Sequence, residues 1–431
     1  MGSPFKIGII GAGPAGTFFA LHLNRLASSN NREYQITLYD RKSFDLVGPR
    51  GCNMCAGAIG YITYKKIMDL GLELDDDVIR SILDGYIIHG RKRMAKIIHP
   101  DKSGIFTVFR GGGPIVSDKL RWKSFDQFLL DRCVGKGMLF VNRRVMGVEK
   151  VKIGESIKYR LAIEGESTRE VDLLVGAFGV NSPLSKGFIP GYSPPKTWHT
   201  CQAELQVDMG RIDDPVRKMI NIFSAQDKNI RFIAITPKDE YLTVSAIGEY
   251  VKISDLRREL QINKRLEQFL PNKYKIICHC HPQIAVNSAT KPYDDSVAVV
   301  GDAFISRFLK NGIESAYETS RILAEAVITH GVSEDALRNH FYNKCLDLYH
   351  YDNNWGKRLF LVYERIFRKG FLSDLYIACV EGEGADASDM KARLTRVLWG
   401  VFAGDQSYKE IFKEACSFPT LSSFLKHTLF P

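Results

Sequence analysis

The sequence has no uninterrupted apolar run of about 18 residues, the length at which a segment becomes a candidate membrane-spanning helix, so we expect no such helix. It also lacks internal repeats, low-complexity linkers and a basic, cleavable leader, which argues against a solenoid and against secretion. Its nine cysteines form no regular framework and are odd in number, so we expect reduced thiols and a cytoplasmic protein. The 431 residues, 45% of them hydrophobic and 25% charged, suffice for a large globular core.

Acidic side chains are outnumbered by basic ones, 49 against 59, which gives a formal net charge of +10. The basic residues are dispersed and their densest groups, at 91–93 and 257–258, are short, so we expect no nucleic-acid partner. Three interpretations of the excess charge remain open. It can form a solvated surface, attract anionic lipid headgroups, or dock an acidic electron-transfer protein.

What the N-terminal segment does have is the pattern of a dinucleotide-binding strand, turn and helix. An apolar strand is expected at 7–10, the turn GAGPAG follows at 11–16, and an apolar helix is expected at 17–26. The first glycine allows the bend, the second lets the backbone approach a pyrophosphate, and the third lets helix and strand pack closely. N–H groups at the helix N-terminus then face the phosphates. A second strand, at 34–39, ends at Asp40, whose carboxylate can bind both ribose hydroxyls, so the segment predicts a bound adenine dinucleotide.

The rest of the chain has the patterns of a mixed fold, in which helical spacing favours helices and alternating or buried apolar runs favour strands. The alternating runs between 197 and 250 suggest an antiparallel sheet inserted between pieces of the dinucleotide domain, and the segment after 330 is expected to be mostly helical. Helices are expected at 64–70, 124–134 and 312–329, strands at 85–89, 148–163, 172–177, 202–207, 231–235, 241–247 and 297–300, and loops at 45–60 and 111–114.

Three further motifs recur together with this N-terminal unit in one superfamily. They are an arginine before Phe-Asp at a helix start, at 121–126; Gly-Asp-Ala followed by a turn and a helix, at 301–316; and Cys-Ala-Gly-Ala-Ile at 55–59. On these motifs the sequence resembles the two-domain FAD oxidoreductases typified by p-hydroxybenzoate hydroxylase. Within that group it is most similar to the geranylgeranyl reductases, which saturate isoprenoid double bonds. The resemblance covers residues 5–330 approximately and is weaker in the C-terminal helices.

The resemblance implies FAD as the cofactor, together with the residues that bind it. Arg121 is expected near the pyrophosphate, because a guanidinium suits paired phosphate oxygens. Asp302 is expected to accept a hydrogen bond from a ribityl hydroxyl, and the helix N-terminus at 312–313 to stabilise reduced flavin. Lys310 and Asn311 replace the usual Gly-Glu of this turn, and a lysine there would make the flavin easier to reduce. The expected cofactor-binding residues are Gly11, Gly13, Ala15, Gly16, Asp40, Arg41, Arg121, Gly301, Asp302, Asn311, Gly312 and Ile313.

The resemblance also places a cysteine beside the reacting part of the substrate. Chlorophyll-type geranylgeranyl reductases carry Cys-Gly-Gly-Ala-Ile where this chain has residues 55–59, so Cys55 is the candidate catalytic thiol facing the alkene and a candidate proton source. Cys52 and Cys55 also form a Cys-x-x-Cys pair, so dithiol exchange, metal binding and an inert packed thiol are alternatives. We expect no metal, because no second pair follows at zinc-ligand spacing.

Two departures from the family pattern bear on the electron donor and the substrate. In the family, a loop Gly-Ala-Asp-Gly contacts FAD and NADPH, and in this chain Phe178 replaces the acid of that loop. This replacement argues against direct reduction by NADPH. The electron donor therefore stays open between reduced ferredoxin and NADPH. The Tyr-x-Trp-x-Phe-Pro motif of the lipid channel corresponds to 232–237, where Ala234 replaces the tryptophan and a wider pocket would follow. Core packing alone is the alternative for this strand. The expected substrate-binding residues are Gly57, Phe232, Ala234 and Pro237.

Three other patterns remain. A strand through Cys-His-Cys-His at 278–281 would put its cysteines on one face and its histidines on the other, so one tetrahedral metal site is not expected there. Trp355, Phe360 and Phe367 can form either a core seam or a lipid-facing surface. The segment 398–405 resembles segments near the end of geranylgeranyl reductase-like chains, and no chemical role can be assigned to it.

Together these patterns predict an α/β (α+β) fold with a Rossmann-like FAD-binding domain, an inserted antiparallel-sheet substrate domain and a C-terminal helical region. The predicted function is an FAD-dependent reductase that saturates carbon–carbon double bonds of a polyprenyl group in an isoprenoid or prenylated lipid, with peripheral membrane contact as an option. The alternatives are a flavin monooxygenase or halogenase, against which the absence of Trp-x-Trp-x-Ile-Pro argues, and a non-catalytic FAD carrier. The expected domain divisions are 1–60, 104–185 and 286–330 for the first, 61–103 and 186–285 for the second, and 331–431 for the third.

Overall fold

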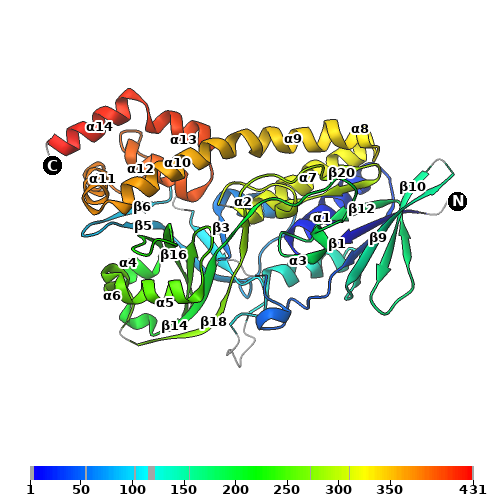
Figure 1. Ribbon diagram of the computed structural model, residues 1–431, viewed down its shortest axis with the longest axis horizontal. Coiled ribbons are helices and arrows are strands. Elements are labelled where there is room, and N and C mark those ends of the chain that lie inside the picture. Colours follow the sequence, from blue (N-terminus) through cyan, green and yellow to red (C-terminus); the bar gives the residue numbers. More distant parts are fainter. Residues whose placement is uncertain are drawn as a thin grey trace.

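The computed structural model of the protein describes residues 4–53, 56–100, 103–114, 122–154, 156–271, 273–309 and 311–429. The molecule is elongated, with β1 (Phe5–Ile10) toward one end and α11 (Gly370–Glu383) and α14 (Phe418–Leu429) at the other (Figure 1). The described strands form two large sheets and three small ones. The predicted fold class, a Rossmann-like domain with an inserted, largely antiparallel sheet and a C-terminal helical region, is confirmed.

A six-stranded sheet carries the predicted dinucleotide unit, in the order β20-β21-β12-β1-β2-β8. Its neighbouring strands are parallel except β20 and β21. α1, α3 and α7 pack beside it, while the small β11-β10-β9 sheet lies against Gly8 of β1. Because both faces are covered, the central strands are buried over residues 7–10 of β1 and throughout β12, as in parallel sheets generally. The strands are β1 (Phe5–Ile10), β2 (Tyr34–Tyr39), β8 (Leu139–Val141), β12 (Leu173–Gly176), β20 (Tyr293–Asp294) and β21 (Val297–Val299), and the helices are α1 (Pro14–Ser29), α3 (Phe125–Val134) and α7 (Gly312–His330).

A seven-stranded sheet forms the second layer, in the order β18-β14-β17-β16-β15-β5-β6. All its pairs are antiparallel except β15 with β5, which joins a strand near the N-terminus to a sheet made mostly after residue 200. The predicted inserted sheet is therefore present, and the domain boundaries stay a prediction. The strands are β5 (Gly85–His89), β6 (Met94–Ile98), β14 (Cys201–Val207), β15 (Met219–Ser224), β16 (Phe232–Lys238), β17 (Tyr241–Ile247) and β18 (Tyr274–Cys280), with α4 (Asp214–Arg217), α5 (Ile253–Ile262) and α6 (Lys264–Phe269) beside them.

Three small sheets and short helical turns complete the part of the chain before residue 310. The predicted loop at 45–60 is wrong at its end, because residues 58–60 form a strand that pairs with β7. α1 begins at Pro14, ahead of the predicted start, since proline suits the first position of a helix. The remaining elements are β3 (Ala58–Gly60), β4 (Ile79–Leu83), β7 (Ile105–Val108), β9 (Val145–Ile153), β10 (Ser156–Ile163), β11 (Arg169–Val171), β13 (Thr197–His199), β19 (Gln283–Ala285), α2 (Tyr61–Asp69), and 3-10 turns at Gly48–Arg50, Pro183–Ser185, Met209–Arg211 and Gly301–Ala303.

The C-terminal region is helical, as predicted. Trp355, Phe360 and Phe367 pack partly buried against a core that includes Tyr86 and Ile220 of the seven-stranded sheet, which confirms the core seam. None of the helices in the described ranges has both the length and the apolar character needed to cross a membrane. The elements are α8 (Glu334–Leu337), α9 (Asn343–Cys345) between π-helical turns at Arg338–Tyr342 and Leu346–His350, α10 (Tyr351–Arg368), α11 (Gly370–Glu383), α12 (Arg393–Ala403), α13 (Tyr408–Ala415) and α14 (Phe418–Leu429).

Candidate cofactor and substrate site

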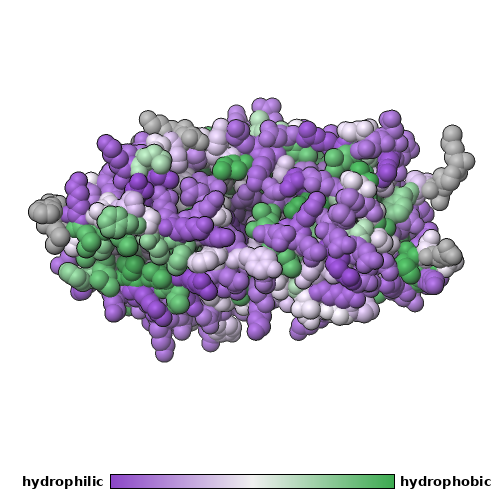
Figure 2. All heavy atoms as spheres, turned by 90° about the horizontal axis from the view of Figure 1, so that it is seen from above, coloured by the Kyte–Doolittle hydropathy of each residue, from purple (hydrophilic) through white to green (hydrophobic). Residues whose placement is uncertain are grey.

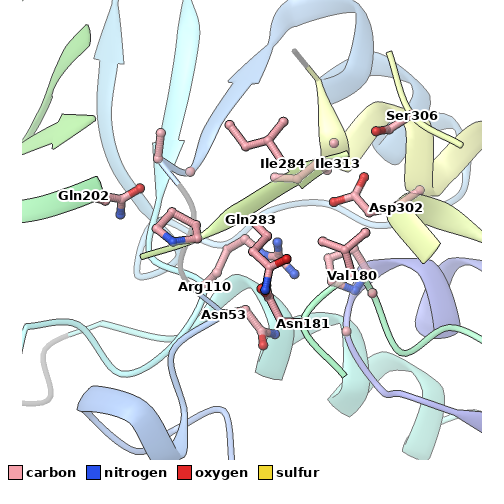
Figure 3. A pocket seen from close by; sticks show the side chains of 18 of the residues that line it. Asn53, Arg110, Val180, Asn181, Gln202, Gln283, Ile284, Asp302, Ser306 and Ile313 are labelled. Atoms are coloured by element: carbon pink, nitrogen blue, oxygen red, sulfur yellow. The ribbon is translucent and has the colours of Figure 1, made fainter. Parts of the chain in front are cut away.

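A cavity of about 1000 Å³ runs from the glycine turn before α1, past the N-terminus of α7, to the face of the seven-stranded sheet and to α12. Figure 3 shows Gln202 reaching into it from one side and Asp302 from the other, with Arg110 and Asn53 between them. This volume is at the upper end of the range typical of small-molecule and cofactor sites, so it can hold a large ligand.

The glycines of the turn before α1 have two different roles. Gly11 and Gly16 are required by the close approach of backbone atoms, and Gly13 leaves open space. A Cβ on Gly11, whose φ is +106°, would overlap the carbonyl oxygen of Ala177, and a Cβ on Gly16 would overlap that of Gly11. Gly13 differs, because a Cβ there would have no neighbour nearer than 3.6 Å. Gly11, Gly13 and Ala15 line the cavity, while Gly16 only packs behind it. Gly13 is therefore the glycine of this turn that leaves room for a ligand, and among the described residues no side chain caps the first turn of α1.

Asp40 lies at the end of β2, beside this turn, as predicted. Its Oδ2 accepts a hydrogen bond of 3.0 Å from the N–H of Ala12, and its Oδ1 accepts one of 3.0 Å from the N–H of Lys42. Burial raises the pKa of Asp40 above its ordinary value. Asp40 and the exposed Arg41 both line the cavity. The carboxylate is thus held by backbone at the position where a ribose would lie.

The arginine that the structure brings to the turn is Arg110. Arg121, the predicted phosphate ligand, lies outside the described residues, as do Cys55 and Lys310. Arg110 forms a bidentate ion pair with the fully buried Asp126, Nε to Oδ1 at 2.8 Å and Nη2 to Oδ2 at 2.9 Å. The Cβ position on Gly13 is 3.6 Å from Arg110 Nη2.

Asn53 also donates to Asp126, and Lys42 Nζ donates to Asn53 Oδ1 at 2.6 Å. The two cationic side chains and the amide thus form one network around a single buried carboxylate, on the side of the cavity that faces the turn. Asp126 belongs to the Phe-Asp motif, so that motif was the available signal. Arg110 itself precedes a run of glycines that predicted only a turn.

Asp302 follows β21 and points into the cavity beside the N-terminus of α7 (Figure 3). Its Oδ1 is buried and has no hydrogen-bond partner among the described residues, and burial raises the pKa of Asp302. Asp302 Oδ2 is 3.5 Å from the Cβ position on Gly312. A buried carboxylate oxygen without a partner is costly, which indicates that a ligand hydroxyl completes this site. Gly301 does not line the cavity and lies against Ala15.

The N-terminus of α7 borders the same part of the cavity. Asn311, Gly312 and Ile313 line it, and no side chain among the described residues caps the first turn of α7. Asn311 is left-handed, with φ at 52°, and its Nδ2 donates to Glu314 Oε2 at 2.9 Å and to the carbonyl of Gly404 at 3.2 Å. The side chain of Asn311 is therefore engaged with the C-terminal region, and the backbone of the turn faces the cavity.

The other end of the cavity is largely apolar. Gly57, Phe232 and Ala234 line it as predicted, but Pro237 is buried in β16 outside the lining. Ile222 lies opposite Ala234 in the sheet, so the small side chain leaves open space on that face. The further apolar lining comes from Tyr86, Ile105, Ile220, Ile222, Trp399 and Phe402. We call this end of the cavity, which is lined by the residues named in this paragraph other than Pro237, the apolar chamber.

Two acids in the apolar chamber, the buried Glu204 and the half-buried Asp405, were missed by sequence reasoning. Burial raises the pKa of Glu204 on β14, and both of its oxygens accept from the Thr243 hydroxyl, at 2.9 and 2.8 Å. Burial also raises the pKa of Asp405, which follows α12. Its Oδ2 accepts from Trp399 Nε1 at 2.7 Å, while its Oδ1 is buried with no partner among the described residues. The resemblance at 398–405 pointed to this segment but gave no role.

The Cys-His-Cys-His segment forms the end of β18 and the residue after it. Cys278 and Cys280 are half-buried, while His279 and His281 are exposed, as the predicted alternation requires. Burial raises the pKa of Cys280, with a further contribution from the nearby Cys52. Cys52 and both β18 cysteines line the cavity, so thiols border it on this side.

The comparisons with known proteins agree with this architecture. No protein-family model and no curated protein matches the sequence. A geranylgeranyl bacteriochlorophyll reductase-like protein from Thermoplasma acidophilum superposes with a TM-score of 0.68 at 14% identity, over 96% of this chain and 98% of that one. A flavoprotein/dehydrogenase from Cytophaga hutchinsonii gives 0.65 at 15% identity, over 97% and 98%. A triple mutant of the flavin-dependent brominase Bmp2 gives 0.63 at 17%, over 95% and 97%. The chain thus has the fold of these flavoproteins along its whole described length.

Proposed function

We propose that the protein is an FAD-dependent oxidoreductase that saturates carbon–carbon double bonds of a polyprenyl group. The observation that carries this proposal is the continuity of one cavity from the glycine turn to the apolar chamber. A redox cofactor bound at the turn and at α7 would present its ring to an apolar ligand in that chamber. The likeness in fold to a geranylgeranyl bacteriochlorophyll reductase-like protein supports the same substrate class.

The residues of the cavity fit FAD in order along its length. Asp40 would bind the adenosine ribose, and Gly13 with Arg110 the pyrophosphate. Asp302, with its unpartnered Oδ1, would accept from a ribityl hydroxyl, and the N–H groups at the start of α7 would stabilise negative charge at the flavin edge. Reduced FAD, when bound, supplies a hydride, which is two electrons and one proton.

The chain itself has to exclude water and supply the second proton. An isolated alkene has no carbonyl that could hold a carbanion, so charge develops as a cation and protonation must lead or accompany hydride addition. Cys55, the predicted source, lies outside the described residues. Asp405 is better placed than Glu204, because its buried Oδ1 has no partner among the described residues while Thr243 occupies both oxygens of Glu204. Asp405 would donate this proton to one carbon of the double bond while the other carbon receives the hydride, and its carboxylate would then regain a proton from water.

An oxygen-dependent reaction is the second candidate, because the fold is shared with flavin halogenases and a brominase. One of these, the halogenase PltM, was solved with phloroglucinol and FAD. The two candidates differ in what reoxidises reduced flavin, and that difference can be measured directly.

The deciding experiment is an anaerobic titration of the purified protein loaded with FAD. NADPH is added first and dithionite second, which also tests the electron donor, and geranylgeranyl diphosphate or a prenylated phospholipid follows. Reoxidation of the flavin without oxygen, with two hydrogens gained per reduced bond in the mass of the product, would support the proposal. The reduced flavin could instead be reoxidised by no prenyl compound, but by oxygen together with turnover of an aromatic substrate. That result would replace the proposal with the second candidate.

A further inference from the structure

The last helix, α14, exposes a stripe of large apolar side chains. Phe418, Leu421 and Leu425 are 83%, 52% and 57% exposed and recur at the spacing of one helix face. Another face of α14 packs against the protein, since Thr420 is buried and Phe424 contacts the core that α11 and α12 share. α14 therefore carries apolar side chains on its exposed side as well as against the protein.

The neighbouring helix α11 continues this apolar surface. Phe371 and Leu372, in its first turn, are 77% and 38% exposed. α11 and α14 pack against each other. Figure 2 shows a broad group of hydrophobic residues at the end of the molecule where α11 and α14 lie, while the rest of that side is mostly hydrophilic with smaller, scattered hydrophobic groups. We call this surface the C-terminal apolar face, and it consists of Phe371, Leu372, Phe418, Leu421 and Leu425.

Basic side chains adjoin the C-terminal apolar face: Lys369 precedes α11, Lys426 follows Leu425 directly, and Arg91 lies against Gly370. The turn between β5 and β6 lies on the first turn of α11, where the N–H of Lys92 donates to Asp374 Oδ1 at 2.8 Å. The other acid near this turn is also engaged, because Glu381 pairs with Arg93 at 2.9 Å. We call Arg91, Lys92, Arg365, Lys369 and Lys426 the basic rim, because all five are exposed and none of them forms an ion pair with a described residue.

We propose that the C-terminal apolar face and its basic rim dock the protein on the surface of an anionic lipid bilayer. Large apolar side chains would enter the boundary between headgroups and acyl chains, and the basic rim would lie at the level of the phosphates. The positive charge of the basic rim favours an anionic bilayer over a second copy of the chain as the docking partner. A symmetric dimer through this face would bring two basic rims together, on protomers that each carry a formal charge of +10.

This docking goes beyond the proposed function and does not depend on it, because the face lies outside the cavity and needs neither FAD nor a prenyl ligand. If both hold, the bilayer would be the source of the apolar substrate. If vesicles bind and no alkene is reduced, only the proposed function is lost.

The test is co-flotation of the full FAD-loaded chain with vesicles. One set is phosphatidylcholine alone and the other is equal parts phosphatidylcholine and phosphatidylserine. We expect binding to the anionic vesicles that weakens as salt is raised, and much weaker binding to the neutral ones. The double variant Phe371→Ser/Phe418→Ser should lower the partition coefficient about tenfold or more, because each aromatic ring loses its burial in lipid. Arg91→Gln/Lys369→Gln should lower binding to the anionic vesicles selectively.

The matched control is Val134→Ser/Ile153→Ser, which removes two apolar side chains of 48% and 47% exposure at the ends of α3 and β9, away from α11 and α14 (Figure 1). This control should bind as the native chain does, and unchanged FAD content and melting temperature show that each variant is folded. Three results would overturn the proposal. They are no binding of the native chain to anionic vesicles, an equal loss in the control, and a dimer in size-exclusion chromatography that Phe371→Ser/Phe418→Ser dissociates.

Discussion

Replacing Gly13 by alanine would separate ligand binding from folding in the glycine turn. Gly13 has φ −73° and ψ −175°, which any residue can adopt, and the space around its Cβ position is open to 3.6 Å. Reduced entropy of the unfolded chain would stabilise the variant by about 0.4–1 kcal/mol. Loss of glycine at the helix N-cap would cost a similar amount, about 0.5–1 kcal/mol. We therefore expect the free energy of unfolding of the FAD-free protein to change by less than about 1 kcal/mol.

The same methyl group would stand between the pyrophosphate and the N–H groups of α1. Losing one charge-assisted hydrogen bond costs about 1.5–3 kcal/mol, so the Kd for FAD should rise about ten- to hundredfold. Quenching of FAD fluorescence during titration measures the Kd, and urea unfolding without FAD measures the stability.

Gly11→Ala is the matched control, because it makes the same chemical change at φ +106° where the Cβ would overlap a carbonyl oxygen. It should lower the free energy of unfolding by about 1–3 kcal/mol or more. Native-like FAD affinity in Gly13→Ala would show that the pyrophosphate does not approach this turn. Destabilisation of Gly13→Ala as large as that of the control would show that the fold, and not a ligand, requires the glycine.

Three further predictions concern the buried charges. Asp126→Asn should lower the free energy of unfolding by about 3 kcal/mol in urea, because Arg110 loses its buried partner, and a change below about 1 kcal/mol would refute that account. Asp405→Asn should slow alkene-driven reoxidation of reduced flavin about a hundredfold and leave the rate of reduction by dithionite unchanged. Glu204→Gln should leave both rates near native. Equal losses of the reoxidation rate in the two variants would remove Asp405 as proton donor. Because burial raises the pKa of Asp302, the folded FAD-free protein holds that proton more tightly than the unfolded chain. The contribution of Asp302 to the free energy of unfolding is present below the ordinary pKa of 3.8 and is lost as pH rises through the raised pKa. Because asparagine does not titrate, Asp302→Asn should flatten the fall in melting temperature as pH rises.

Local patterns predicted the dinucleotide unit, because each of its parts is encoded within a few residues. The glycine spacing fixes the turn, period-two or continuous apolar runs fix β1 and β2, and Asp40 follows the second strand directly. The inserted sheet was also predictable in kind, since its strands alternate. Its order was not, because the parallel pairing of β15 with β5 joins residues more than a hundred positions apart, and no periodicity encodes such a contact.

The side chains of the site were predictable only where a motif names them. Asp302 follows a strand at a fixed position, whereas Arg110 becomes a site residue through its ion pair with Asp126 on another element. Asp405 enters the apolar chamber because α12 packs across the seven-stranded sheet, where Tyr86 donates to the carbonyl of Phe402 at 2.8 Å. Single-sequence patterns describe one element at a time, so groups that meet through tertiary packing are the ones they miss.

The C-terminal region is part of the site and not an appendage to it. Among the contacts that join it to the turn before α7 are those of Asn311 Nδ2 with the carbonyl of Gly404 at 3.2 Å, of Arg307 with the carbonyl of Gln406, and of the Tyr408 hydroxyl with the carbonyl of Phe308 at 2.7 Å. Asp40 follows β2, Gly13 precedes α1 and Arg110 lies after β7, and none of these residues takes part in these contacts. The turn before α7 and the segment that carries Asp405 do take part in them, so the flavin end and the apolar chamber are built partly by this docked segment. A surface of α11 and α14 that rests on a bilayer would therefore be rigidly connected, through α12, to the wall of the chamber.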